Sequence, residues 1–547
     1  MFVGIDIGGT FTDVVAVNNN TICYQHKLPT TNNILECVLK ALDALLERIG
    51  KDEISRLCIS TTIITNTIVK NNLPPTTLII MPGPGLNCEH SFPVKPTVIS
   101  GYTNHLGNTT AAAGVSELSD CIHANNIAIS GKFSVRNPEN EQAVLSYLKA
   151  NSPNANIVAA HMLSGKLNFI RRTNTAYYAA ATQEIFAKFK KQVKQAVLER
   201  NLNIPITILK ADAGAVNLDQ DMINTAEFVF TGPSASVLGI KALIQPQDDC
   251  IALDIGGTTT DISFWHRGQP LLNHKGAKIS NFDTSINTFY MQSLALGGNS
   301  IVYHQANKIS IGPEISADCI CLGGDHLTLT DIFSLLGVAN IGDSKYVRNY
   351  LENYGLVTNF AEQVFELALN TIKQKLFDMI EEINRTPVYT VADLFAPDIF
   401  TPNRIIGVGD AATAIVPHLS KSMNLKYYIP EFAPVANALG ASLAKPTMIA
   451  SIQVNTLAGY YTLSQDSNRY HAPRNLNKHM TKEILLKNIQ NLASSAKVSL
   501  PESDIEVSEY EEYTVLSGYS DNDLVINMTM QVKPDILVKI LDGGACK

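Results

Sequence analysis

One eight-residue motif occurs twice in this chain of 547 residues, once in each half. Residues 6–13 read DIGGTFTD and residues 254–261 read DIGGTTTD, so the two copies differ at a single position. Each copy follows a short apolar, β-rich stretch and precedes another, a pattern that predicts strand, tight glycine turn and strand. A chain that contains this unit twice is expected to fold into two similar halves.

Paired glycines at such a turn let backbone amides approach phosphate oxygens, because a Cβ would block the approach. Threonine hydroxyls add further donors. The predicted phosphate-binding residues are Gly8, Gly9, Thr10 and Thr12 in the first loop, and Gly256, Gly257, Thr258 and Thr259 in the second. The leading Asp6 and Asp254 are placed to hold Mg²⁺ through water. Asp13 and Asp261 close the loops identically, and we expect at least one of them to act on nucleotide, water or substrate.

Two other nucleotide-binding loops do not fit these residues. A dinucleotide fingerprint needs glycines that open a helix, whereas TFTDVVAV and TTTDISFW are typical of strands. A Walker loop needs Gly-Lys-Ser/Thr, and the Gly-Lys pairs at 131–132 and 165–166 fail this because Phe133 and Leu167 follow them. A plain hairpin without a ligand is the remaining alternative, and the duplication argues against it.

Composition narrows the class of protein. A net charge of −8 and dispersed Lys and Arg argue against a nucleic-acid partner. Asp6 interrupts the N-terminal apolar stretch, and long uncharged apolar runs are lacking, so we expect a cytoplasmic protein without a membrane segment. Nine scattered cysteines suit a reducing compartment. Cys319 and Cys321 allow two interpretations, a metal site completed by Asp318 or His326, or a buried strand.

Strand-turn-strand loops with Asp and glycines in both halves resemble those of the actin, sugar-kinase and heat-shock chaperone superfamily. The closing Thr and Asp resemble the hydantoinase A/5-oxoprolinase family in particular. Further pieces follow in that family's order over about residues 1–450: STTIITNT at 60–67, TGPSASVLG at 231–239, LGGNS at 296–300, IGPE at 311–314 and GVGDA at 407–411.

The resemblance assigns further site residues. Nucleotide-binding positions by this comparison are Gly297, Gly298, Gly407, Gly409, Asp410 and Ala411, and the substrate side would include Thr61, Thr62 and Asn66. Asp410 stands where the family usually has glycine, and Asn299 replaces the third glycine of its loop. We expect Asp410 to contact the ribose of the nucleotide, the alternatives being repulsion of the phosphates or an N-cap of the following helix.

The fold implied by the resemblance is α/β, with duplicated ribonuclease H-like (actin-like ATPase) lobes and a nucleotide cleft between them. The expected domains are 1–245, with an irregular insertion at about 83–150, then 246–450, and a C-terminal α+β domain at 451–547. The hinge is expected at the helices after Pro233 and Asn437. Apolar residues at helical spacing predict helices at 34–49, 174–201, 356–384 and 481–497.

The function implied by the resemblance is ATP-dependent opening of a cyclic amide such as a hydantoin or 5-oxoproline, with Mg²⁺ and phosphorylation of the amide oxygen. Family members of this type commonly work with a second, hydantoinase B-like hydrolase subunit, so such a partner and a homo-oligomer are expected. Two alternatives stay open: a small-metabolite kinase, and a non-catalytic ATP-binding sensor or assembly subunit.

Overall fold

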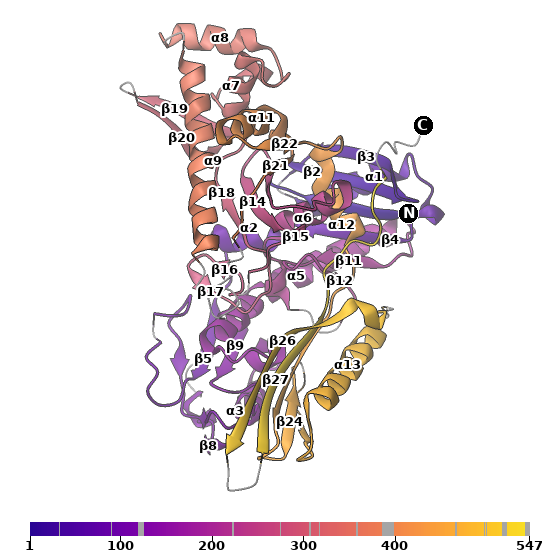
Figure 1. The fold of residues 1–547 in the computed structure, drawn as a ribbon, viewed down its shortest axis with the longest axis vertical. Coiled ribbons are helices and arrows are strands. Elements are labelled where there is room, and N and C mark those ends of the chain that lie inside the picture. Colours follow the sequence, from indigo (N-terminus) through magenta and orange to yellow (C-terminus); the bar gives the residue numbers. More distant parts are fainter. Residues whose placement is uncertain are drawn as a thin grey trace.

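The computed structural model describes residues 1–547 except 32, 89, 119–124, 221–223, 274, 306–307, 317, 357–358, 386–398, 465, 467, 497, 499, 517–521 and 542–547. The chain is mixed α/β, as predicted, and its sheets are built from segments that lie far apart in the sequence (Figure 1). Within the described residues, no helix combines the length and the apolarity needed to cross a membrane.

The first six-stranded sheet has the order β12-β11-β4-β1-β2-β3. Its strands are β1 Phe2–Ile7, β2 Phe11–Asn18, β3 Thr21–Pro29, β4 Arg56–Thr61, β11 Ile206–Leu209 and β12 Ala215–Asn217. The first glycine motif joins β1 to β2 as an antiparallel hairpin, and β4 runs parallel to β1. Strand β1 is buried along most of its length because it lies inside the sheet. The predicted strand, turn and strand are confirmed here.

The second six-stranded sheet repeats this arrangement. Its strands are β13 Cys250–Ile255, β14 Thr260–His266, β15 Gln269–Pro270, β18 Met291–Leu294, β21 Arg404–Val408 and β22 Lys426–Tyr428. The second glycine motif joins β13 to β14 as an antiparallel hairpin, and β21 runs parallel to β13. The register is also the same, because Asp6 pairs with Asp13 in one hairpin and Asp254 with Asp261 in the other.

Two short helices, α6 Thr231–Leu243 and α12 Ala436–Leu443, pack against each other between the two sheets. Their contact is close because glycines face the partner backbone: a Cβ on Gly239 would lie 2.1 Å from the carbonyl oxygen of Ala436, and one on Gly440 would lie 2.0 Å from that of Ala235. One apolar core joins these helices to strands of both sheets.

The four predicted helices are all present, and asparagine side chains cap the N-termini of three of them. They are α1 Ile34–Leu46, α5 Phe169–Glu199, α9 Phe360–Asn384 and α13 Lys478–Ser495. Helix α5 begins earlier than predicted because the side chain of Asn168 accepts a hydrogen bond from the backbone N–H of Arg171. Asn33 and Asn477 cap α1 and α13 in the same way.

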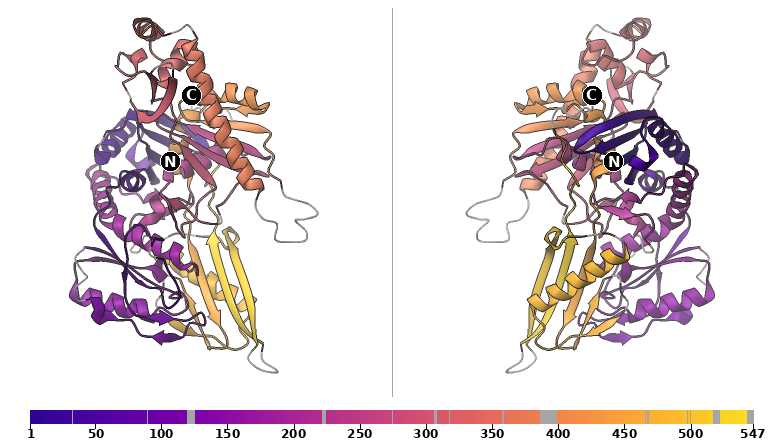
Figure 2. Two further views of the ribbon diagram at one scale, coloured as in Figure 1. Left: turned by 90° about the vertical axis from the view of Figure 1, so that its left-hand side faces the viewer. Right: turned by 90° about the vertical axis from the view of Figure 1, so that its right-hand side faces the viewer.

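Two smaller sheets lie side by side at one end of the molecule (Figures 1 and 2). One has the order β10-β9-β5-β6, and the C-terminal one has the order β25-β24-β23-β27-β26. Their strands are β5 Thr76–Met81, β6 Thr97–Val98, β9 Asn126–Gly131 and β10 Asn156–Ala159, then β23 Ile449–Asn455, β24 Tyr460–Leu463, β25 Arg469–His471, β26 Ile505–Leu516 and β27 Asn522–Val532.

Hydrogen bonds join the C-terminal sheet to segments beside the other sheet, including one from the Thr462 hydroxyl on β24 to the carbonyl oxygen of Val135 in the turn after β9. The segment expected to be an irregular insertion contains regular elements, namely β9 and α3 Glu139–Asn151. The domain boundaries themselves stay predictions.

Candidate functional site

The two glycine loops face each other. Each makes the same turn, in which the N–H of Gly8 donates to Phe11 O at 3.0 Å and the N–H of Gly256 donates to Thr259 O at 3.0 Å. A Cβ on Gly9 would lie 3.5 Å from Thr258 Cγ2.

The contact is reciprocal, because a Cβ on Gly257 would lie 3.1 Å from Thr10 Oγ1. Two segments almost half the chain apart therefore form one site, with their amides and the hydroxyls of Thr10 and Thr258 close together. Thr12 has a different role: its side chain is buried, and its hydroxyl lies 2.9 Å from that of Thr30.

Four aspartates lie in and behind these loops: Asp6, Asp13 and Asp254 are buried, and Asp261 is half-buried. Burial raises the pKa of Asp6 to about 6 and those of Asp13 and Asp261 to about 7, and it also raises the pKa of Asp254. The aspartates also repel one another, since the charge of Asp254 raises the pKa of both Asp6 and Asp261. Such a cluster gains stability from a cation.

Mg²⁺ fits this cluster on the residues present. Asp6 Oδ1 is buried and lacks a hydrogen-bond partner among the described residues. Asp254 accepts a hydrogen bond from Asn437 Nδ2 at 3.0 Å, which orients its carboxylate. Carboxylate oxygens are the ligands that Mg²⁺ prefers, with water completing its shell. Asp6 and Asp254 are therefore the candidate Mg²⁺ residues.

Two further loops of the second half pack on its glycine loop. Residues 297–299 are hydrogen-bonded to it, from the N–H of Gly298 to Gly256 O at 3.0 Å and from the N–H of Asn299 to Gly257 O at 2.7 Å. Gly297 is required for this approach, because a Cβ would lie 2.6 Å from the carbonyl of Gly257. Residues 297–299 therefore hold the carbonyl groups of the second glycine loop in place.

The loop at 407–411 approaches Asp254. Gly409 has a φ of +85°, and a Cβ there would lie 2.6 Å from Asp254 Oδ1. The N–H of Ala411 donates to Ile255 O at 2.9 Å. Asp410 does not cap the next helix, since α11 Ala412–Met423 has Ala411 at its N-cap without a side-chain hydrogen bond. The carboxylate of Asp410 contacts Lys27 instead.

Lys27 is the site residue that the sequence analysis missed. Its Nζ lies 3.0 Å from Asp13 Oδ1, 3.0 Å from Asp410 Oδ2 and 3.2 Å from Pro434 O, so it joins the two halves of the chain. Burial lowers its pKa, but Asp13 and Asp410 outweigh this and the pKa is raised. The available signal was cross-strand pairing, because Lys27 on β3 lies opposite Asp13 on β2.

The predicted substrate residues lie beside the first loop. The hydroxyl of Thr62 donates to Ile7 O at 3.3 Å, and Asn66 Nδ2 donates to Thr62 Oγ1 at 3.1 Å. Asn66 is exposed on α2 Ile63–Val69. Thr61 is buried, and its carbonyl accepts from the hydroxyl of Thr231 on α6 at 2.8 Å. Thr62 and Asn66 therefore border the loop, whereas Thr61 contacts the helix between the sheets.

Cys319 and Cys321 lie apart from the glycine loops, in the core of the second half. They are not on a strand: Cys321 belongs to a short 3₁₀ helix, Ile320–Leu322. Their sulfur atoms are 3.8 Å apart. The third possible metal ligand beside them is Asp331, and not Asp318 or His326 as expected. Both carboxylate oxygens of Asp331 accept backbone N–H groups, which accounts for its position without a metal.

The raised pKa values predict a pH-dependent stability. Between about pH 4 and 7 the folded state holds protons on these aspartates that the unfolded state has lost, so the stability of the metal-free protein should fall as pH rises through this window. The thermal midpoint should be lower at pH 8 than at pH 5. In Asp261→Asn the decrease in thermal midpoint between pH 5 and pH 8 should be smaller than in the parent. An unchanged decrease would contradict the raised pKa of Asp261.

Solved structures show where the fold occurs elsewhere. A nucleotide-free acetone carboxylase structure is 16% identical, with a TM-score of 0.71, over 98% of this chain and 88% of that chain. The ATP-dependent caprolactamase structure from Pseudomonas jessenii is 17% identical, with a TM-score of 0.70, over 99% of this chain and 88% of that chain. Both share the fold of this chain along nearly its whole length.

Two relatives match by sequence. An uncharacterised protein of Methanocaldococcus jannaschii is 23% identical over 430 residues, which are 70% of this chain and 62% of that protein. Caprolactamase subunit alpha of Pseudomonas jessenii is 21% identical over 490 residues, which are 81% of this chain and 70% of that protein. The match thus spans less than two thirds of the Methanocaldococcus relative.

Two family models match the sequence. The model described as hydantoinase/oxoprolinase matches residues 172–450, which is more than half of the chain. The model of the hydantoinase/oxoprolinase N-terminal region matches residues 2–100 and includes the first glycine loop. The chain belongs to the hydantoinase/oxoprolinase family.

Proposed function

We propose that this chain binds one Mg-ATP between two actin-like lobes and uses it to open a cyclic amide. The observation that carries the proposal is the reciprocal contact between the two glycine loops, Gly9 against Thr258 and Gly257 against Thr10. A pair of amide-rich turns that face each other suits a polyphosphate, which has anionic oxygens on several sides. The family and the ATP-dependent caprolactamase relative support the same reaction class.

Each group of residues has a role in this proposal. The amides of the two loops, with the hydroxyls of Thr10 and Thr258, hold the phosphates. Asp6 and Asp254 hold Mg²⁺ through water, and the ion neutralises phosphate charge. Asp13 and Asp261 orient water or substrate. ATP would supply the phosphoryl group that activates the amide oxygen for displacement.

The Lys27–Asp410 ion pair favours a nucleotide site over a degenerate one. Asp410 alone would repel phosphates, but Lys27, whose Nζ lies 3.0 Å from its carboxylate, neutralises that charge. We therefore retain Asp410 on the ribose side, with Gly407, Gly409 and Ala411 forming the small-residue surface for the purine. Closure of the two halves would exclude water from the site.

A second subunit is part of the proposal. The Pseudomonas jessenii relative is named as a subunit alpha, and hydrolysis of the activated amide is assigned here to a hydantoinase B-like partner. A homo-oligomer of the resulting pair is proposed as well.

The test measures ATP binding and phosphate release separately. Calorimetry should show one Mg-ATP site per chain, and phosphate release should rise when a cyclic amide and a hydantoinase B-like subunit are both added. Absence of ATP or ADP binding at millimolar concentration would overturn the proposal. Transfer of phosphate to a stable hydroxyl ester would establish a kinase instead, and binding without turnover a sensor.

A further inference from the structure

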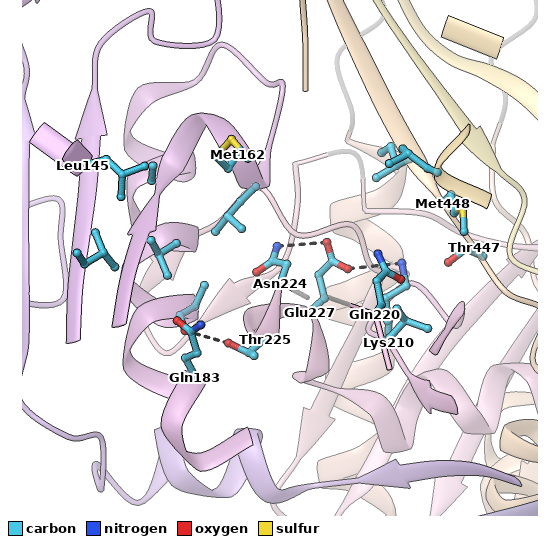
Figure 3. Close-up of a pocket in the computed structure, with 18 of the residues that line it drawn as sticks. Leu145, Met162, Gln183, Lys210, Gln220, Asn224, Thr225, Glu227, Thr447 and Met448 are labelled. Atoms are coloured by element: carbon cyan, nitrogen blue, oxygen red, sulfur yellow. Dashed lines mark hydrogen bonds and ion pairs between the residues drawn. The ribbon is translucent and has the colours of Figure 1, made fainter. Parts of the chain in front are cut away.

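A cavity of about 330 Å³ lies where the first sheet, the β10-β9-β5-β6 sheet and the C-terminal sheet meet (Figure 3). Its volume is in the range of small-molecule sites in proteins. Its walls come from segments between Leu145 on α3 and Leu492 on α13, so it forms only when the chain is folded.

Most of the cavity wall is apolar. The side chains of Leu145, Ile157, Met162, Val216, Met448 and Leu492 belong to this wall, and Figure 3 shows Leu145, Met162 and Met448 around the space. Two methionines allow the wall to adapt to the shape of a ligand. The body of a ligand that fits here is therefore hydrocarbon.

One side of the cavity is polar, and its groups are held in place. Lys210 Nζ lies between two carboxylates, 3.1 Å from Asp212 Oδ2 and 3.5 Å from Glu227 Oε2. Glu227 Oε1 accepts a hydrogen bond from Asn224 Nδ2 at 3.2 Å. The carbonyl oxygen of Asn224, Oδ1, is buried and lacks a hydrogen-bond partner within the described part of the chain.

This polar side offers one acceptor and one donor to a ligand. Asn224 Oδ1 can accept an N–H, and Lys210, which has three N–H groups, can donate to a carbonyl. The carboxylates of Asp212 and Glu227 around the single ammonium of Lys210 leave an excess of negative charge on this side. The other lysine of the lining, Lys149, lies on the exposed face of α3 at the edge of the cavity. A ligand carboxylate placed against this side would be repelled.

The cavity opens at the same edge of the first sheet as the first glycine loop. Strands β1, β4 and β11 are parallel neighbours, and Ile5, Ile59 and Ile208 lie in register across them. Lys210, two residues beyond Ile208, is therefore level with Ile7, which precedes Gly8. Neighbouring strands are about 4.8 Å apart, and β4 lies between β1 and β11, so the backbones of Lys210 and Ile7 are roughly 10 Å apart across the sheet. Ligands of parallel sheets bind at this carboxyl edge.

We propose that this cavity binds the cyclic amide, and that it selects an uncharged amide with an apolar ring over one that carries a carboxylate. The amide N–H donates to Asn224 Oδ1, the amide carbonyl accepts from Lys210, and the ring lies against the apolar wall. The inference rests on the proposed function for the class of ligand, whereas the residues that bind it are assigned from the cavity alone.

The experiment measures binding without nucleotide, using ε-caprolactam and 5-oxoproline as probes and calorimetry on the full chain. Caprolactam should bind at least 10-fold more tightly than 5-oxoproline. Asn224→Leu, which keeps the branching of the side chain but removes the acceptor and the hydrogen bond to Glu227, should weaken caprolactam binding about 10-fold. Met162→Trp, which fills the cavity, should abolish it. Asn353→Leu, an exposed change on α8 Ser344–Asn353, is the matched control and should bind like the parent.

The outcomes separate this inference from the proposed function. If caprolactam fails to bind, if 5-oxoproline binds as tightly, or if Asn224→Leu and Met162→Trp bind like the parent while their thermal midpoints are retained, the cavity assignment is overturned. Lactam-stimulated phosphate release whose KM is unchanged in both variants would also overturn it and leave the proposed function standing. Lactam binding without stimulated phosphate release would support the cavity and contradict the proposed function.

Discussion

Asp6→Asn and Asp254→Asn should each lower Mg-ATP turnover by roughly 10²–10³-fold, because each removes a charge from the proposed Mg²⁺ and phosphate site. The two losses should be similar, since Asp6 and Asp254 occupy the same position in two hairpins of the same register. The thermal stability of both variants should stay at or above that of the parent although their activity falls. Burial disfavours both carboxylates in their ionised form, so a neutral side chain of the same size removes a desolvation cost.

The measurement pairs phosphate release with the thermal midpoint of each variant at pH 8. Asp52→Asn, an exposed carboxylate change on the same half of the chain, is the control and should leave both quantities unchanged. A variant of either loop that binds and turns over Mg-ATP like the parent would show that its loop is structural only. A large decrease in the midpoint would mean that the carboxylate supports the fold.

Gly239→Ala and Gly440→Ala should lower stability by about 3 kcal/mol or more, which is at the upper end of the range for overpacking. The added methyl group would lie 2.1 Å from Ala436 O or 2.0 Å from Ala235 O, and backbone atoms cannot rotate away as a side chain can. The two helices would have to separate. Nucleotide affinity should fall as well, because α12 contains Asn437, which orients Asp254.

Gly232→Ala is the matched control for this prediction. Gly232 lies in the same helix as Gly239, and a Cβ there would meet no atom within 4 Å outside its chain neighbours and its own helix backbone. Pro233 follows it, so only a small local backbone cost is expected. Its thermal midpoint should stay within a few degrees of the parent. If Gly239→Ala and Gly440→Ala behave like Gly232→Ala, the close contact of the two helices does not contribute to stability.

The elements around the site could be predicted from the sequence because their causes are local. A strand, two glycines and a strand define the turn within eight residues, and α1 begins at Ile34, as its apolar spacing predicts. Helix α13 begins at Lys478, three residues before the predicted start, because Asn477 caps it there. The Asp-to-Asp register within each hairpin follows from the length of that turn. A helix bound such as the start of α5 was missed because the signal at Asn168 is a single residue.

The sequence by itself determined that two nearly identical glycine loops exist and that each follows an apolar strand, since both depend on neighbouring residues. Only the tertiary structure decided that Thr10 faces Gly257 and that Lys27 contacts Asp410, which is 383 residues away. The cavity beside Lys210 was also decided there, from residues between 145 and 492. The physical reason is that contacts at such separations depend on how whole sheets and helices pack, and the residue pattern of a single sequence has no periodic signal for that packing.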